Sequence, residues 1–300
     1  MRDLKWQNLY CSESATLYAN WDSGFFSNCS TALWALTDLA GEGITPNRVC
    51  MDKGWSFYRD SENKKDTDLY PHLFSRKEIP EIQLKTLIPR IDHHRRYSIL
   101  DLKPYLPFVD RWFTPSQEVD LIRTELLQKY QIDPRKMIAV IYRGTDKHKE
   151  VETAPVEKYI KLASKLLRKH RDHRILIQTD QSQVRDLFMS NFGSHCFYFP
   201  EIPVSESVHP VHQMSEEAMG MHKTKFAKTL LAITYLISRC NIIVNHTGNM
   251  ALWIILYRGN TTSSYQFDEN GECSDPRGRN VTTNPLRMIK RICQDWSESG

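Results

Sequence analysis

Continuous apolar runs alternate with amphipathic stretches over the second half of the chain. The run Met137–Tyr142 contains β-branched residues and few polar ones, which is typical of a strand buried on both faces. After Pro155, the apolar residues fall on one stripe at helical spacing. Further strands are expected at 175–177, 196–199 and 241–244, and further helices around 184–188, 226–237 and 249–257. This order predicts a parallel, doubly wound sheet.

The first half shows the same alternation of strands and helices less clearly. Strands are expected at 15–20 and 48–51, with a helix between them that ends near Gly41, and an amphipathic helix at 116–130. We therefore expect an α/β protein with two Rossmann-like domains that face a central cleft. Residues 1–133 would form the first domain and 134–284 the second, and a C-terminal helix in 285–300 would pack back on the first.

Composition narrows the class of protein. A chain of 300 residues with 40% hydrophobic and 25% charged residues is typical of a globular protein, and no apolar run is long enough to span a membrane. The net charge of +4 permits an anionic ligand but does not favour nucleic acid as a partner. Seven scattered cysteines without a C-x-x-C pair, and no signal-peptide core, predict reduced thiols in the cytoplasm. A chain trimmed of an anchor would give the same pattern.

Polar clusters follow three of the expected strands. They are residues 143–147, Thr179-Asp180 and residues 245–249. The carboxyl ends of parallel strands meet at one edge of a sheet, where ligands bind. Arg143 could clamp a phosphate bidentately, and the helix that begins near Asn249 offers free N–H groups to an anion. Each cluster alone is also compatible with local ion pairing or an ordinary strand-to-helix turn.

The order of these clusters resembles the α1,6-fucosyltransferases. The family motif H-V-R-R-T-D-K is similar to I-Y-R-G-T-D-K at 141–147, and its P-I-E-E-Y helix start is similar to P-V-E-K-Y at 155–159. Weaker matches follow at 178–181, 218–222 and 246–249. The resemblance covers about 120 residues in collinear order. Residues 1–133 show nothing that aligns.

The resemblance implies an inverting, metal-independent GT-B glycosyltransferase without a cofactor. Its partners would be a nucleotide-sugar donor and a glycan or glycoprotein acceptor. Arg143 would stabilise the leaving diphosphate with Lys147, and Glu150 or its rival Glu152 would be the catalytic base. The other donor-binding candidates are Thr145, Asp146, Thr179, Asp180, His222, Thr247, Gly248 and Asn249.

Three departures from the family bear on the donor. The second arginine of the motif is Gly144 here, the motif histidine is Ile141, and the aspartate that the family offers to guanine lines up with Ala232. Alanine cannot accept the N–H groups of guanine. The sequence therefore favours a UDP-sugar, with UDP-xylose, as used by a virus-encoded xylosyltransferase of this kind, as the specific candidate. GDP-fucose is the alternative.

Other interpretations concern different classes of protein. A catalytically silent protein that binds nucleotides or sugars would keep the same fold. The D-x-D at 66–68 lies in a charged, turn-rich stretch rather than at a strand end, which disfavours a metal site. The stretch Asp92-His93-His94 precedes two arginines, which favours a basic surface loop over a metal site. Acceptor contacts are expected from aromatic and acidic residues near the first helix, Trp21, Asp22 and Phe25, although these aromatic rings could equally belong to the core.

Overall fold

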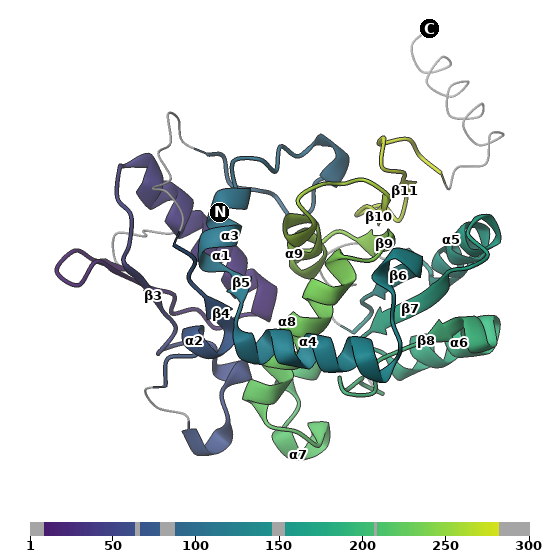
Figure 1. Ribbon diagram of the computed structural model, residues 1–300, viewed down its shortest axis with the longest axis horizontal. Coiled ribbons are helices and arrows are strands. Elements are labelled where there is room, and N and C mark those ends of the chain that lie inside the picture. Colours follow the sequence, from purple (N-terminus) through teal and green to yellow (C-terminus); the bar gives the residue numbers. More distant parts are fainter. Residues whose placement is uncertain (1–8, 64–66, 79–87, 146–153, 207–208, 282–300) are drawn as a thin grey trace, which may run out of the picture.

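A six-stranded sheet organises the second half of the chain (Figure 1). The computed structural model describes residues 9–63, 67–78, 88–145, 154–206 and 209–281. The strand order is β11-β10-β9-β6-β7-β8, in which β11 alone is antiparallel to its neighbour. The strands are β6 (Met137–Tyr142), β7 (Arg174–Thr179), β8 (Cys196–Phe197), β9 (Ile242–His246), β10 (Ser264–Phe267) and β11 (Cys273–Ser274). Since β6 pairs with both β7 and β9, the chain changes direction across the sheet at the carboxyl end of β6.

Helices cover both faces of this sheet, as the sequence predicts. Ile138 and Val140 of β6 pack with α5 (Val156–Lys169) and α6 (Ser182–Phe192). Ala139 and Ile141 point to the opposite face, where they share a core with two apolar helices. Those helices are α8 (Lys223–Ser238) and α9 (Asn249–Arg258). The alternation explains why the whole of β6 is apolar. The predicted parallel, doubly wound sheet is confirmed, and β10 and β11 are additions that the sequence analysis did not predict.

Local sequence signals set the helix ends. The α9 helix ends at Gly259, whose φ of 76° lies in the left-handed region that favours glycine, and its N–H bonds to the last carbonyls. The helix α4 (Gln117–Lys129) begins after Ser116, whose hydroxyl accepts the Val119 N–H at 3.3 Å.

The first half is less regular than expected. Its described residues form a three-stranded sheet of β1 (Tyr10–Cys11), β2 (Thr16–Tyr18) and β3 (Arg48–Cys50), in which β1 is antiparallel to β2. The expected strands at 15–20 and 48–51 and the helix α1 (Phe25–Gly41) are present, but a doubly wound sheet is not formed by these residues. Short helices and turns take its place. They are α2 (Tyr70–Leu73), α3 (Leu106–Trp112), 3-10 turns at Ser56–Tyr58, Ser61–Asn63 and Tyr97–Ile99, and the two-residue strands β4 (Phe74–Ser75) and β5 (Thr114–Pro115).

Buried aromatic side chains hold these short elements together. Trp55, Tyr58, Tyr97 and Trp112 are each at most 2% exposed. Large rings bury much apolar area per residue, so irregular backbone can be stabilised without long strands. The short elements between β3 and α4 therefore show no alternation of apolar and polar residues that would predict strands.

One hydrophobic core joins the two halves of the chain. It runs from Leu17 and Phe25 through Trp253 on α9 to Ala139 on the sheet, and α4 lies along α8 (Figure 1). The division into 1–133 and 134–284 stays a prediction, and the C-terminal helix predicted at 285–300 lies outside the described residues. Within the described residues, no helix is both long and apolar enough to cross a membrane, and the cysteines are all free thiols.

Candidate functional site

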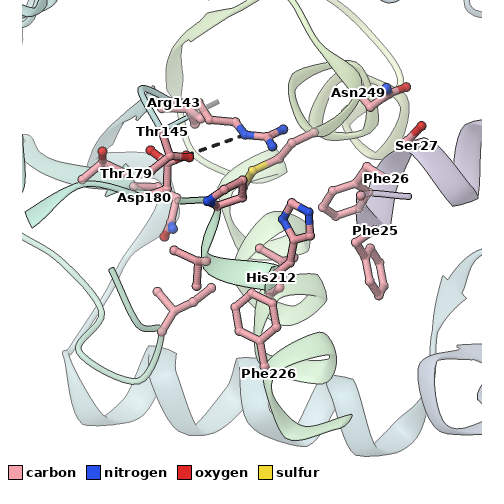
Figure 2. Close-up of a pocket in the computed structure, with 18 of the residues that line it drawn as sticks. Phe25, Phe26, Ser27, Arg143, Thr145, Thr179, Asp180, His212, Phe226 and Asn249 are labelled. Carbon is pink, nitrogen blue, oxygen red and sulfur yellow. Dashed lines mark hydrogen bonds and ion pairs between the residues drawn. The ribbon is translucent and has the colours of Figure 1, made fainter. Parts of the chain in front are cut away.

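A cavity of about 430 Å³ opens at the carboxyl ends of β6 and β7 (Figure 2). Its volume is in the range of small-molecule sites. Both halves of the chain line it: the sheet and α8–α9 on one side, the start of α1 and residues 93–94 on the other. The cavity thus lies where the strand order of the sheet reverses, the position at which open α/β sheets bind ligands.

Arg143 and Asp180 form the polar end of the cavity. Asp180 follows β7, and its carboxylate accepts the Gly144 N–H at 2.9 Å and the Thr145 hydroxyl at 2.7 Å. The same carboxylate lies 3.7 Å from Arg143 Nε. Three groups of the loop after β6 are therefore held by one side chain, and Figure 2 shows the contact between Arg143 and Asp180. The Arg143 side chain remains 29% exposed.

The loop after β6 is tightly built. Thr145 is fully buried, and the adjacent Thr179 hydroxyl accepts the Gln181 N–H at 3.2 Å. A Cβ on Gly144 would lie 2.1 Å from the Gln181 side-chain oxygen and 2.9 Å from the Tyr142 ring. A side chain at position 144 would require Gln181 to move. In this chain, the side-chain amide of Gln181 fills the space that a side chain at position 144 would occupy.

Asn249 lines the opposite wall of the polar end, at the first turn of α9. Its side-chain oxygen accepts a hydrogen bond from Ser30 Oγ at 2.8 Å, and Ser30 Oγ accepts one from the Trp253 indole at 3.0 Å. Ser30 lies on α1 and is 1% exposed. The Ser30 hydroxyl also lies 2.9 Å from the Phe26 carbonyl, so these contacts tie Asn249 to α1 beside the start of a helix, where the dipole favours an anion.

Aromatic side chains form the other end of the cavity. Phe25 and Phe26 begin α1, and the Phe25 N–H donates to the Tyr58 hydroxyl at 2.6 Å. The Tyr58 ring stacks on Phe226 and on His212, with centroids 6.2 and 6.4 Å apart. Figure 2 shows His212 and Phe226 at this end of the cavity. This end offers flat apolar faces, which suit a nucleobase or a sugar ring.

A buried lysine holds the turn that carries His212. The ammonium of Lys223 donates to the carbonyls of His212, at 2.8 Å, and Met214. Its side chain is largely buried, and this burial lowers the pKa of Lys223. The position of His212 in the cavity is thus set by a contact from the first turn of α8.

The structure brings together some of the predicted site residues. Arg143, Thr145, Thr179, Asp180, Asn249 and Phe25 all line the cavity. Asp146, Lys147, Glu150 and Glu152 lie outside the described residues, so their predicted roles stay predictions.

Other predicted residues lie away from the cavity. Thr247 is 1% exposed, and the Gly248 N–H already donates to the His93 carbonyl at 3.0 Å. His222 precedes α8 and faces Glu216 at 3.4 Å. Trp21 packs against the core, and the Asp22 carboxylate accepts the Ser56 N–H at 2.7 Å. Within the described part of the chain, the cavity is not lined by any of the five predicted residues Trp21, Asp22, His222, Thr247 and Gly248.

Of the two residues that align with the family's guanine contacts, only one lies at the cavity. Ile141 lines the cavity, but Ala232 is fully buried in the core on α8 and does not. The side chain at 232 does not face the cavity, so Ala232 carries no information about a bound base. The argument against guanine from Ala232 therefore does not hold, because the sequence alignment assumed that this position of α8 faces the donor.

Several residues of the cavity were not predicted from the sequence, among them Tyr58, His212 and Phe226 at its aromatic end. His93 and His94 line it, although the sequence analysis assigned them to a basic surface loop. Ser30 positions Asn249 from the other half of the chain. Ser30 lies far from Asn249 in the sequence, so no local pattern predicts their contact. For the histidines, the only signal in the sequence was their position before two arginines.

A separate group of possible ligand atoms lies between the two halves. Among the described residues, Asp60, Glu216 and His222 bring such atoms within 4.8 Å of one another. The Glu216 carboxylate already accepts the Lys223 N–H at 2.9 Å and the Ser61 N–H at 3.1 Å. Asp60 accepts the Thr224 N–H at 2.7 Å. These carboxylates therefore cap the start of α8.

We expect this cap to make stability depend on pH. Hydrogen bonds from Ser61, then Lys223, lower the pKa of Glu216 from 4.5 to about 2. Its contribution is present above pH 4.5 and is lost as the pH falls toward 2. Glu216→Gln should cost about 1 kcal/mol at pH 7, and this cost should shrink in urea unfolding at pH 3. The exposed neighbour Glu217→Gln is the matched control; an equal loss in both variants would contradict the cap.

Comparisons with known proteins place the fold. No family model matches the sequence, and no curated protein matches it. Among solved structures, fucosyltransferase NodZ from Bradyrhizobium matches over 86% of this chain and 97% of its own, with a TM-score of 0.51 and 12% identity. The fold resembles that of a fucosyltransferase. At this identity, the likeness to NodZ concerns the fold alone.

Two further NodZ α1,6-fucosyltransferase structures match less completely. One was soaked with GDP-fucose and the other co-crystallized with GDP. They are 16% identical over 59% and 58% of this chain, with TM-scores of 0.38 and 0.39. This chain spans about half the length of these two, 54% and 52%.

Proposed function

We propose that the chain is a glycosyltransferase that takes a sugar from a nucleoside diphosphate and passes it to a glycan hydroxyl. The observation that carries this proposal is the arrangement of Arg143 and Asn249 on facing walls of one cavity, at the reversal point of a parallel sheet. A guanidinium, a side-chain amide and a helix start lie around one cavity there, and such groups can hold a diphosphate. The fold likeness to NodZ supports the same class.

In the proposed reaction, a base removes a proton from the acceptor hydroxyl as its oxygen attacks the anomeric carbon. The bond to the diphosphate breaks on the opposite face, which inverts the configuration. Arg143 and Asn249 stabilise the charge that develops on the leaving phosphate oxygen. The reaction needs no metal ion in this scheme. Glu150 and Glu152 follow the Arg143 loop along the chain and stay the predicted bases.

The GT-B arrangement is part of the proposal. The cavity is walled by residues 23–27 and Tyr58 from the first half and by the sheet of the second. The polar end belongs mainly to the second half, which suits the donor. Phe25 and Tyr58 at the aromatic end come from the first half, which suits the acceptor or the sugar, and His212 and Phe226 at the same end come from the second.

GDP-fucose is the donor we propose first. The argument from Ala232 against guanine does not hold in this fold, and the fold is similar to that of a fucosyltransferase. A UDP-sugar is the second candidate, because Ile141 lines the cavity where the fucosyltransferase motif has a histidine. No contact in the cavity favours xylose over another sugar.

A thermal-unfolding panel tests the site and the donor together. We expect a nucleoside diphosphate at a hundredfold excess over its Kd to stabilise the native chain by about 2.7 kcal/mol, because it binds only the folded state. The panel contains GDP, UDP, ADP, TDP and CDP, each with and without Mn²⁺. Stabilisation by GDP alone, independent of Mn²⁺, is the expected result.

The other outcomes separate the alternatives. Stabilisation by UDP alone would make a UDP-sugar the donor, and dependence on Mn²⁺ would overturn the metal-independent mechanism. Stabilisation by none would contradict the proposed function. A chain that binds GDP but releases no GDP from GDP-fucose in the presence of glycan acceptors would fit a silent binding protein.

A further inference from the structure

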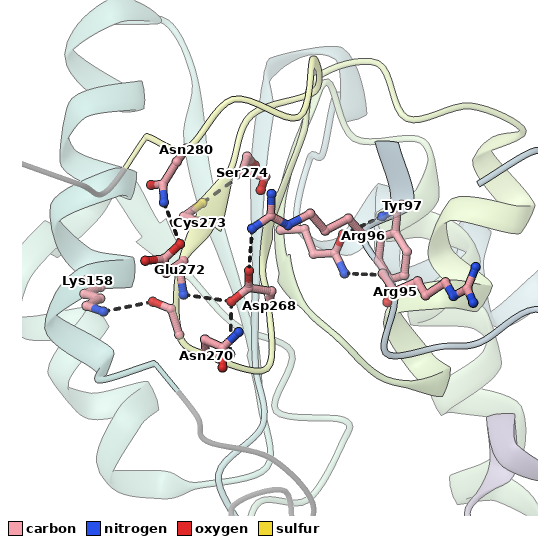
Figure 3. Close-up of polar contacts among 12 residues, drawn as sticks. Arg95, Arg96, Tyr97, Lys158, Asp268, Asn270, Glu272, Cys273, Ser274 and Asn280 are labelled. Carbon is pink, nitrogen blue, oxygen red and sulfur yellow. Dashed lines mark hydrogen bonds and ion pairs between the residues drawn. The ribbon is translucent and has the colours of Figure 1, made fainter. Parts of the chain in front are cut away.

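Residues 92–97, the sequence D-H-H-R-R-Y, cross from the first half of the chain to the six-stranded sheet, at the carboxyl ends of its strands. We call this segment the histidine strap. It lies over the carboxyl ends of β9 and β10 and the start of α9 (Figure 3). Two of its side chains, His93 and His94, line the cavity described above.

Backbone and side-chain hydrogen bonds anchor the strap to β10. The Tyr97 N–H donates to Gln266 Oε1 at 2.7 Å, and Gln266 Nε2 donates to the Arg95 carbonyl at 3.0 Å. The buried Tyr97 hydroxyl lies 3.2 Å from the Gly248 carbonyl and donates toward it. The strap is therefore fixed to the same turn that begins α9.

An ion pair secures the strap farther along β10. Figure 3 shows the ion pair between Arg96 and Asp268, in which Arg96 Nη2 lies 3.1 Å from Asp268 Oδ2. The Asp268 side chain is only 7% exposed. The other oxygen of Asp268 accepts the N–H groups of Asn270 and Glu272, each at 3.0 Å. This carboxylate is held on the sheet side, so Arg96 docks on a preformed partner.

The strap brings its two histidines to the cavity beside the start of α9. The His93 carbonyl accepts the Gly248 N–H, one residue before Asn249. The His94 N–H donates to Asp92 Oδ1 at 2.9 Å, which fixes the turn. The Nδ1 atom of His94 is buried and bonds to no atom of the described residues. A buried polar atom without a partner is costly unless a ligand or water meets it.

We infer that His94 is a donor-binding residue that contacts the diphosphate, an inference that rests on the proposed function. The carbonyl of the preceding residue, His93, accepts the Gly248 N–H beside Asn249, and the His94 side chain lines the same cavity as Arg143 and Asn249. An imidazole N–H that faces the cavity can donate to a phosphate oxygen. The first half of the chain then supplies one donor to the phosphate site, and Arg143 and Asn249 supply the others.

Titration calorimetry with GDP, UDP, guanosine and inorganic pyrophosphate tests this inference. We expect His94→Ala to weaken GDP and pyrophosphate binding at least tenfold and to leave guanosine binding within twofold. His94→Asn, which keeps an N–H donor, should recover part of the loss. Arg95→Ala is the matched control, because Arg95 is on the same strap but its side chain is 67% exposed and does not line the cavity.

The outcomes distinguish this inference from the function on which it rests. If the wild-type chain bound neither nucleotide nor pyrophosphate, both would fall. If Arg143→Ala lost binding and His94→Ala kept it, only the role of His94 would fall. An equal loss of guanosine and GDP in His94→Ala would show that the ring only supports the fold, and this would overturn the inference. Thermal unfolding of each variant shows whether the fold is intact.

Discussion

Arg143→Ala should slow sugar transfer roughly a hundredfold while the chain stays folded. The guanidinium reaches the cavity from the end of β6, and its loss removes the main charge opposite the leaving phosphate. Such a contact contributes about 3 kcal/mol to the transition state, which is roughly a hundredfold in rate. Stability should change by less than about 1 kcal/mol, because the ion pair to Asp180 is long and partly exposed. Initial rates of nucleotide release and urea unfolding measure the two effects.

Two variants sharpen this test. Arg143→Lys keeps the charge but loses the bidentate fork, so its activity should fall between wild type and Arg143→Ala. Arg135→Ala is the matched control, because Arg135 precedes the same strand at its other end and pairs with Asp133 at 3.0 Å in solvent. A rate for Arg143→Ala within tenfold of wild type would contradict the proposed role.

The sequence predicts the second half of the chain well, for physical reasons. A strand buried on both faces must be apolar throughout, and Met137–Tyr142 is β6 residue for residue. The helix after Pro155 has its apolar residues on one stripe because only one face meets the sheet. The clusters after β6 and β7 meet at one edge because parallel strands end together. These properties are local, and so is the pattern that reveals them.

The rest of the site depends on contacts between distant residues. Asn249 is positioned by Ser30, and Gly248 is covered by the His93 carbonyl. Periodicity carries no information about such pairs. The first half shows the same limit: its core is built from aromatic residues in turns, such as Trp55 and Tyr97, which leave no regular pattern. Whether His222 and Ala232 face the cavity depends on how α8 is oriented about its own axis, and sequence alignment alone does not give this orientation.

Asp180→Ala should have a larger effect on stability than Arg143→Ala and a similar effect on rate. Its carboxylate is the acceptor for the Gly144 N–H and the fully buried Thr145 hydroxyl. Leaving two such donors without an acceptor costs about 3 kcal/mol. The loop after β6 would then shift and carry Arg143 with it, and a displacement near 1 Å costs roughly a hundredfold in rate. Urea unfolding and initial rates measure both losses in one variant.

Asp180→Asn separates the geometry of this loop from its charge. An amide can accept the Gly144 N–H with its oxygen and donate to the Thr145 hydroxyl with its nitrogen, so the loop keeps its hydrogen bonds. We expect stability within about 1 kcal/mol of wild type and a rate loss of about tenfold or less. Asp186→Ala is the control, since Asp186 also pairs with an arginine but is 64% exposed on α6. If Asp180→Asn lost as much activity as Asp180→Ala while staying folded, the carboxylate would act on the ligand directly and not by holding Arg143.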